Sequence, residues 1–218
     1  MRIVVFAKER PGLKEALRLL RKQTDDVIVF KGKVGDTFPR RARNIKCDII
    51  ISYISPWVIP ASVLRGAKKF AINFHPGPPE YPGIGCSNFA IYNHEKEYGV
   101  TAHIMEEAVD TGMIIAAERF PIYLHDTVYS LTQRSYKKLL TLFRKVMAGI
   151  FNKNEIMPLE GGWKRRPYTR KQLNDLCRVS LKMDKKEVDR RIRAAVYPDM
   201  PGPYLMFRGH KFIYDHEN

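Results

Sequence analysis

An asparagine and a histidine stand two positions apart at the head of a rigid loop. Asn73 and His75 follow the short run 69–72, which is typical of the end of a buried strand, and residues 76–85 contain four prolines and three glycines. Such a loop cannot continue a helix or a strand. On an extended backbone, residues two apart point to the same side. An amide beside an imidazole suits acyl transfer, because the amide can hold a developing oxyanion while the imidazole moves a proton or supplies positive charge.

A carboxylate follows downstream, between two predicted strands. Residues 99–105 have the composition of a strand, Asp110-Thr111-Gly112 forms a turn, and residues 113–116 resume a strand. Asp110 can orient His75, raise its pKa, or accept a proton itself. The sequence leaves open whether His75 or Asp110 is the formal base. It also allows Asn73 and His75 simply to cap a strand and brace the turn.

Three patterns occur in a fixed order along the chain. They are Asn-x-His-Pro with its Pro/Gly-rich loop, then Gly-Val-Thr-x-His at residues 99–103, then Asp-x-Gly before an apolar strand. Together they resemble the folate-dependent formyltransferases, well over residues 1–150 and more loosely beyond. The resemblance implies an N-formyltransferase that takes its formyl group from 10-formyltetrahydrofolate, leaves tetrahydrofolate and needs no metal. It also implies a catalytic trio of Asn73, His75 and Asp110.

The same resemblance places the pterin ring of the formyl donor between two loops. One loop follows the third predicted strand, and the other precedes the catalytic aspartate. The implied residues are Trp57, Val58, Ile59, Met105, Glu107, Val109 and Asp110. Ser55-Pro56-Trp57 departs from the Tyr-Gly that relatives often show, so the contacts of this loop need not follow the family. The alternative is a hydrophobic loop that packs on the sheet.

We interpret the remaining histidines and the cysteines as structural residues rather than as catalytic groups or metal ligands. We interpret His103 as a core histidine, paired with a carboxylate or backbone, that can support the site from behind. Cys86 is expected to be a small buried side chain rather than a nucleophile. An odd number of cysteines without CxxC argues against disulfides and zinc and fits a reducing cytoplasm; they are Cys47, Cys86 and Cys177. No trustworthy metal-ligand spacing involves His94, His125, His210 or His216.

The apolar pattern predicts an α/β fold. Runs at 2–7, 26–30, 47–53 and 71–73 predict strands, with helices between them over 13–23 and 62–66. This order favours a Rossmann-like, mainly parallel sheet with helices on both faces, the formyltransferase fold. A strand pair is expected at 99–105 and 112–120. Helices are expected from Ser87, as N-cap, to residue 93, and from 127 to 150 with Asp126 as cap.

Composition limits the possible partners. The 218 residues suffice for one core with a small appendage. The longest apolar run is too short to cross a membrane, and no signal peptide is expected. We therefore expect a cytoplasmic protein. The formal charge of +15 favours nucleic acid or a phosphorylated small substrate. Residues 161–218 contain 14 Lys or Arg and 7 Asp or Glu, a net of +7, so this segment is basic out of proportion to its length.

The basic segment indicates the formyl acceptor. Gly161-Gly162 separates a predicted catalytic domain, 1–160, from a C-terminal helix and hairpin subdomain, 161–218, for acceptor binding and dimerisation. These 58 residues are too few for the β-barrel of the tRNA enzymes and resemble the tail of sugar-nucleotide N-formyltransferases. The resemblance implies a dTDP- or UDP-linked amino sugar, with aromatic stacking on the base and cations on the phosphates. The implied residues are Tyr81, Arg166, Tyr168, Arg193 and Tyr197, of which Tyr197 stacks.

Two alternatives and one assembly prediction accompany this interpretation. The alternatives are a methionyl-tRNA formyltransferase-like enzyme and an inactive basic nucleic-acid-binding protein with the same fold. The closing hairpin carries more apolar surface than so small a unit can bury, at residues 205–207 and 212–214, which predicts a homodimer. The expected product is an N-formylamino sugar for surface polysaccharide. The sequence does not distinguish the sugar, its amine position, or the nucleotide base.

Overall fold

A computed structural model describes residues 1–153, 155–198 and 200–215. The last residues of the predicted C-terminal subdomain, with His216, lie outside this range. The elements, in order, are β1 (Ile3–Ala7), α1 (Leu13–Arg21), β2 (Val27–Lys31), η1 (Arg40–Ala42), β3 (Cys47–Tyr53), α2 (Ala61–Leu64), β4 (Ala67–His75), α3 (Cys86–Tyr92), β5 (Glu97–Ile104), β6 (Ile114–Pro121), α4 (Val128–Lys153), α5 (Arg170–Cys177), β7 (Arg178–Val179), α6 (Lys185–Ala195), β8 (Tyr204–Phe207) and β9 (His210–Ile213).

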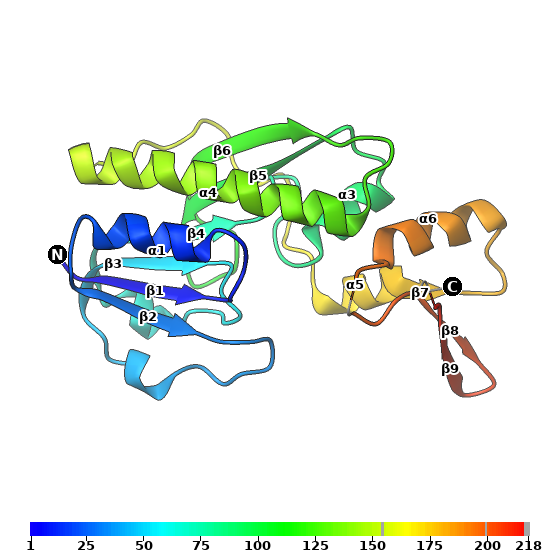
Figure 1. Cartoon of the computed structure of the whole chain (residues 1–218). Helices are drawn as coiled ribbons and strands as arrows, with labels where there is room; N and C mark the ends of the chain where they lie inside the picture. Colours follow the sequence, from blue (N-terminus) through cyan, green and yellow to red (C-terminus); the bar gives the residue numbers. More distant parts are fainter. Residues whose placement is uncertain (154, 199, 216–218) are drawn as a thin grey trace.

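The main sheet has six strands in the order β2-β1-β3-β4-β5-β6 (Figure 1). The pairs β1–β2, β1–β3 and β3–β4 are parallel, whereas β4–β5 and β5–β6 are antiparallel. This confirms the prediction of a mainly parallel sheet followed by a strand pair. The carboxyl ends of the parallel strands therefore meet at one edge, where ligands bind in open α/β sheets.

Helices cover both faces of this sheet, as predicted. On one face, Val5 and Ile51 pack with residues of α1 and the long α4. On the other face, Val4 and Ile50 pack with Ala42 of η1 and residues of α2. The second layer is much shorter than the first (Figure 1), so it leaves part of its face free for other contacts.

Two predicted helix caps are wrong. The N-cap of α3 is Gly85, in a left-handed conformation at φ 70°, and Ser87 instead shares a hydrogen bond with Thr132. Helix α4 begins at Val128, and the hydroxyl of Thr127 accepts the backbone N–H of Ser130 at 3.1 Å. The carboxylate of Asp126 is occupied by the backbone N–H of residue 123 and by an arginine of α4. The start of α3 thus lies two residues before the prediction, and the start of α4 one residue after it.

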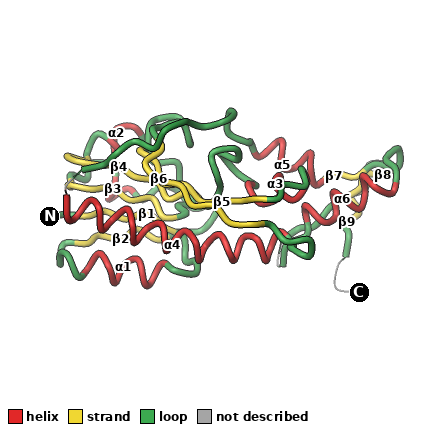
Figure 2. The backbone as a smooth tube through the Cα atoms, turned by 90° about the horizontal axis from the view of Figure 1, so that it is seen from above, coloured by secondary structure: helices red, strands yellow, loops and turns green. Residues whose placement is uncertain are grey.

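The C-terminal elements lie beyond α3 at one end of the molecule (Figure 2). Helix α6 contacts α3, and the side-chain amide of Asn88 donates to the carbonyl of Ala194 at 2.8 Å. A small sheet, β7-β8-β9, closes the chain, with the predicted hairpin at β8–β9. Its turn, Arg208-Gly209, has φ values of 44° and 83°, which suit a tight two-residue hairpin connection. None of the described helices is long and apolar enough to cross a membrane.

Candidate active site

Register between β4 and β5 brings together the side chains that the sequence singled out. Asn73 lies opposite His103, and His75 lies opposite Thr101. Their neighbours Ile72 and the buried residue 74 belong to the core under α4. Because side chains alternate along a strand, Asn73, His75 and His103 all project from the opposite face. This is the face that the shorter layer of η1 and α2 only partly covers.

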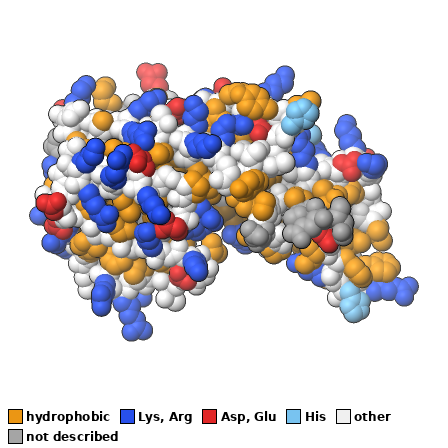
Figure 3. Space-filling view, viewed as in Figure 1, with side chains coloured by type: hydrophobic (Ala, Val, Ile, Leu, Met, Phe, Trp, Pro, Cys, Tyr) orange, Lys and Arg blue, Asp and Glu red, His pale blue; other side chains and the backbone are white. Residues whose placement is uncertain are grey.

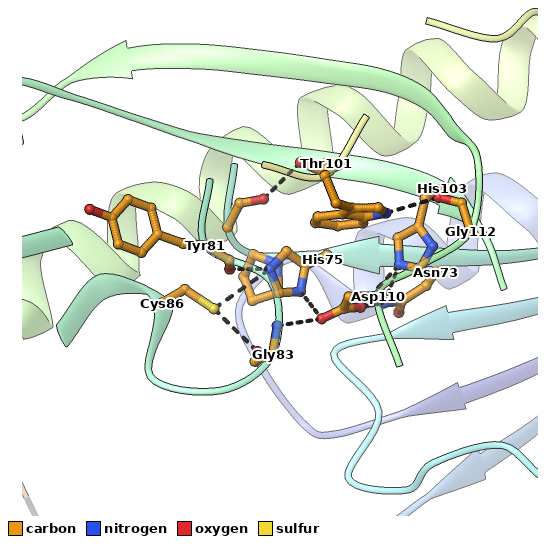
Figure 4. A network of polar contacts seen from close by, with 12 residues as sticks. Asn73, His75, Tyr81, Gly83, Cys86, Thr101, His103, Asp110 and Gly112 are labelled. Atoms are coloured by element: carbon orange, nitrogen blue, oxygen red, sulfur yellow. Dashed lines mark hydrogen bonds and ion pairs between the residues drawn. The ribbon is translucent and has the colours of Figure 1, made fainter. Parts of the chain in front are cut away.

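Asp110 reaches the same point from the loop between β5 and β6 (Figure 4). Its backbone has φ 49°, an uncommon conformation for a residue with a side chain. The carboxylate lies 3.2 Å from Nδ1 of His75 and 3.1 Å from Nε2 of His103. It also accepts hydrogen bonds from Nδ2 of Asn73 at 3.1 Å and from the backbone N–H of Gly83 at 2.7 Å. The structure thus gathers all three members of the predicted trio around one buried carboxylate.

The protonation of His75 follows from its two neighbours. Nδ1 faces the carboxylate of Asp110, and Nε2 lies 3.0 Å from the carbonyl oxygen of Tyr81. Both neighbours are acceptors, so the doubly protonated imidazolium satisfies them both. Burial, the largest single effect, opposes this charge, since His75 is 4% exposed. The carboxylate of Asp110, helped by Cys86 and the carbonyl of Tyr81, more than offsets burial and raises the pKa of His75 to about 10.

Asp110 shows the complementary effect. Burial alone would raise the pKa of this carboxyl group, which is 5% exposed. The charge of His75, the hydrogen bond from His103 and the N–H of Gly83 together lower its pKa below the ordinary value. The pair is therefore ionised at neutral pH, as a buried carboxylate and imidazolium in contact.

His103 stands directly beside this pair. Its Nδ1 donates to the carbonyl of Ile104 at 2.8 Å, and its Nε2 lies 3.0 Å from the amide nitrogen of Asn73. The supporting role expected for His103 stays a prediction, but its side chain contacts two of the three trio members. Cys86 is buried nearby, with its sulfur 3.6 Å from Nε2 of His75.

One residue at this site was not foreseen. The indole of Trp163 lies nearly perpendicular to both imidazoles, with ring centroids 5.6 Å from His75 and 5.0 Å from His103. Its Nε1–H donates to the carbonyl of Gly112 at 2.9 Å. A lone tryptophan after a Gly-Gly pair carries no motif, so nothing local in the sequence could have placed it here.

Comparison with known proteins decides the family. A family model described as Formyl transferase matches residues 15–146, more than half of the chain. The chain belongs to this formyltransferase family. It is a formyl-transferring enzyme. Among residues 1–153, 155–198 and 200–215, no group of three or more His, Cys, Asp or Glu side chains is arranged so that it could hold a metal ion.

Individual relatives are similar to this formyltransferase over most of its chain. GDP-perosamine N-formyltransferase from Brucella melitensis is 30% identical over 91% of this chain and 74% of its own length. Methionyl-tRNA formyltransferase from Alkaliphilus oremlandii is 27% identical over 76% of this chain but 53% of its own length. A similar solved structure is that of an N-formyltransferase from Helicobacter canadensis in complex with folinic acid and dTDP-3-aminofucose. Its superposition on this chain has a TM-score of 0.75 and 22% sequence identity, and it covers 96% of this chain and 85% of the other.

The predicted donor loops of the formyltransferase lie on the same face as the trio. Trp57 packs edge-on against Phe6 at 6.3 Å, and its Nε1–H donates to the carbonyl of Asp36. Trp57 and Met105 border the same apolar cluster, in which Ile59 is buried. Val58, Glu107 and Val109 are exposed. An open pocket of about 480 Å³ lies along Trp57, lined further by Val29, Phe30, Lys31, Asp36, Thr37 and Pro39.

These residues fit a flat aromatic donor. A side chain at Gly32 would collide with the indole of Trp57, so the backbone at Gly32 approaches that ring closely. The apolar cluster beside it includes Ala71, which lies on the same sheet face as Asn73, two residues further along β4. An apolar wall next to hydrogen-bonding groups is the usual composition of a small-molecule site. Which of these residues contact the donor stays a prediction.

The predicted acceptor residues are dispersed. Tyr168 is buried and stacks on Phe89 with ring centroids 3.7 Å apart. Tyr81 is also buried, and its hydroxyl donates to Glu95 at 2.7 Å. Arg193 donates to two main-chain carbonyls before α4, whereas Arg166 is exposed. Tyr197 lies edge-on to Tyr129 at 5.4 Å. Their roles toward an acceptor stay predictions.

A cluster of three cations lies where the β1–α1 turn approaches the start of α5. Lys8 is half-buried; burial lowers its pKa, and the guanidinium groups of Arg10 and Arg170 lower it further. Glu9 pairs instead with Lys31 at 2.7 Å. Within the described part of the chain, no ion pair joins these three cations to a carboxylate. Figure 3 shows a hollow between the two lobes of the molecule, with basic side chains along it.

Proposed function

We propose that this formyltransferase moves a formyl group from 10-formyltetrahydrofolate to the amine of an amino sugar linked to a nucleoside diphosphate. The contact of Asp110 with His75 and Asn73 carries the reaction, because it places a charged donor, an amide donor and a carboxylate at one point. The nucleotide-sugar acceptor is supported by the names of the relatives and by the cation cluster of Lys8, Arg10 and Arg170.

Each member of the trio has a distinct part in this proposal. The donor supplies an activated formyl carbon. The amide of Asn73 donates a hydrogen bond to the oxygen on which negative charge develops, and His75, as imidazolium, stabilises that oxygen by its positive charge. Because both nitrogens of His75 already carry protons, His75 has no free lone pair to accept another. The proton of the attacking amine therefore goes to Asp110, directly or through water. We therefore propose Asp110, rather than His75, as the base.

The acceptor arrangement follows from charge. Two phosphates need fixed cations, and three cations that repel one another without a carboxylate are best accounted for by an anionic ligand. Lys8 and Arg10 follow β1 at the carboxyl edge of the sheet, so a diphosphate held there lies on the same edge as the trio. Arg10 also bonds Tyr136, which lies near Tyr197, the predicted stacking partner for the base. We propose that residues 1–160 perform the transfer and residues 161–218 complete the acceptor site.

Assembly and location complete the proposal. Five apolar side chains of the hairpin region remain exposed: Met206, Phe207, Phe212, Ile213 and Tyr214. We propose that they form part of a homodimer interface. Light scattering that gives a monomeric mass at tens of micromolar protein would count against this. A cytoplasmic enzyme supplying N-formylamino sugars for surface polysaccharide fits the proposed substrates.

A thermal-shift screen tests the acceptor class. A nucleoside diphosphate at about 100 times its Kd stabilises a protein by about 2.7 kcal/mol, which raises the Tm of a chain of this size by about 5–10 °C. dTDP, UDP and GDP are tested, since GDP occurs in the name of one relative. Lys8→Ala should lose most of the shift, whereas Lys22→Ala, an exposed lysine at the end of α1, should keep it.

Two alternatives predict other outcomes. A methionyl-tRNA formyltransferase, the family of one relative, would formylate that tRNA and show no shift with any nucleoside diphosphate. An inactive basic binder would retain nucleic acid at low salt and lose it steeply as salt rises, with no transfer activity. Either result would replace the nucleotide-sugar proposal.

A further inference from the structure

Trp163 belongs to a segment that is attached to the catalytic loops at several points. The backbone N–H of Lys164 donates to the carbonyl of Pro79 at 3.0 Å. Tyr168 both donates to Pro82, at 2.9 Å, and accepts from Ile84, at 3.2 Å. Residues 163–168 therefore run alongside the Pro/Gly loop that follows His75, like an added strand. Trp163 is held at the trio by main-chain contacts on its C-terminal side.

The indole also holds the turn that carries Asp110. Its Nε1–H donates to Gly112, two residues beyond Asp110. A side chain at Gly112 would collide with the carbonyl of Ile104 at the end of β5. The turn is thus enclosed between β5 on one side and Trp163 on the other. Since Asp110 itself adopts a left-handed backbone conformation, its carboxylate depends on this turn for its direction.

The ring has a second effect, on the surroundings of the ion pair. It packs across His75 and His103, which are 4% and 2% exposed, and Trp163 itself is partly exposed. Residues 163–168 bring this ring between the two imidazoles and solvent. In a site from which water is excluded, the attraction between Asp110 and His75 is stronger than in water.

We propose that Trp163 is a positioning residue of the transfer reaction, which orients Asp110 through Gly112 and keeps water from the His75–Asp110 pair. The C-terminal segment then completes the catalytic centre itself, in addition to any contact with the acceptor. This inference does not depend on which acceptor is used. Its test needs no acceptor. The positioning role of Trp163 can therefore be refuted while the proposed function stands, and the proposed function can be refuted while the positioning role stands.

The test follows the titration of His75 by NMR of the histidine side chains. In the native protein the attraction of Asp110, with smaller contributions from Cys86 and the carbonyl of Tyr81, more than offsets the burial penalty, so the pKa of His75 lies above the ordinary value of about 6.5. Water at the pair weakens both effects, and full solvation returns the pKa to that ordinary value. Trp163→Ala should therefore lower the pKa of His75, by about one or more. Trp163→Phe keeps a flat ring but removes the N–H, and should fall between wild type and alanine.

A matched control separates positioning from general stability. Leu20→Ala removes a fully buried side chain of α1, far from the trio, and should lower Tm without moving the titration of His75. If Trp163→Ala does not fold, Trp163→Phe still tests the hydrogen bond to Gly112. Unchanged titration of His75 in every folded Trp163 variant would overturn the proposal, as would a shift of the same size in Leu20→Ala.

Discussion

Asp110→Asn keeps the shape of the side chain and removes its charge. The charge meets His75 at 3.2 Å and His103 at 3.1 Å, and it accepts the N–H of Gly83 at 2.7 Å. An amide oxygen can still accept from Gly83, but it no longer attracts a proton to His75. Burial, which lowers the pKa of an imidazole, is then opposed only by Cys86 and the carbonyl of Tyr81, so we expect the pKa of His75 to fall and its charge to be lost in this variant.

Two losses then reduce the rate. A weakened oxyanion donor typically costs about 10²–10³ in kcat, and a missing general base about 10²–10⁴. These groups act on the same step, so their effects do not simply multiply. We expect kcat to fall by at least about 10³, while KM for donor and acceptor stays within about three-fold, since neither loss removes ground-state binding.

The assay measures tetrahydrofolate formation with the nucleotide amino sugar that protects the protein best in the thermal-shift screen. Asp26→Asn is the control, because its carboxylate pairs with Arg2 at 3.0 Å on the surface. This control should retain wild-type turnover. An Asp110→Asn enzyme within about ten-fold of wild type, or one in which His75 still titrates as in wild type, would refute the reasoning.

Three further predictions concern pH, backbone and acceptor. The stability contributed by the Asp110–His75 pair should be complete between about pH 4 and 6.5. It should decline above about pH 6.5 because the pKa of His75 is raised, and below about pH 4 because the pKa of Asp110 is lowered. Urea melts of wild type and His75→Gln measure this contribution, and a difference in unfolding free energy that stays constant from about pH 6 to 10 would contradict the prediction. Gly83→Ala should cost more in Tm than Gly35→Ala, because both have φ near 90° but a Cβ meets neighbouring backbone at Gly83 and open space at Gly35; equal losses would mean that the left-handed φ alone matters. Tyr197→Ala should raise KM for the acceptor by about five-fold to more than a hundred-fold and leave folate affinity unchanged, which steady-state kinetics with each substrate varied will show.

The trio could be predicted because its geometry is largely local. Asn73 and His75 are two residues apart on a strand, and alternation alone places them on one face. Asp110 follows a strand that pairs with theirs, so a short loop suffices to return its carboxylate. The strand β4 runs through His75, however, further than the sequence indicated, because its pairing with β5 stabilises an extended backbone up to the first proline.

Contacts between distant segments could not be predicted. Trp163 reaches the trio through the path of the chain after α4, which no periodicity describes. The cation cluster joins Lys8 and Arg10 to Arg170, whereas local reasoning favoured the basic run around Arg166. Helix α5 was missed, although Thr169 and Gln172 form a capping box whose Thr-x-x-Gln spacing is a recognisable start signal.

Strand β4 carries core and chemistry on alternate residues. Ile72 and Phe74 fill the core under α4, while Asn73 and His75 face the site. A slip of one residue in its pairing would turn the amide and the imidazole into an apolar core and bring the apolar pair out to the site. Misregistered chains are therefore both unstable and inactive. The formyl-transfer activity recovered after refolding would therefore report the fraction of correctly folded molecules, without a separate measurement of structure.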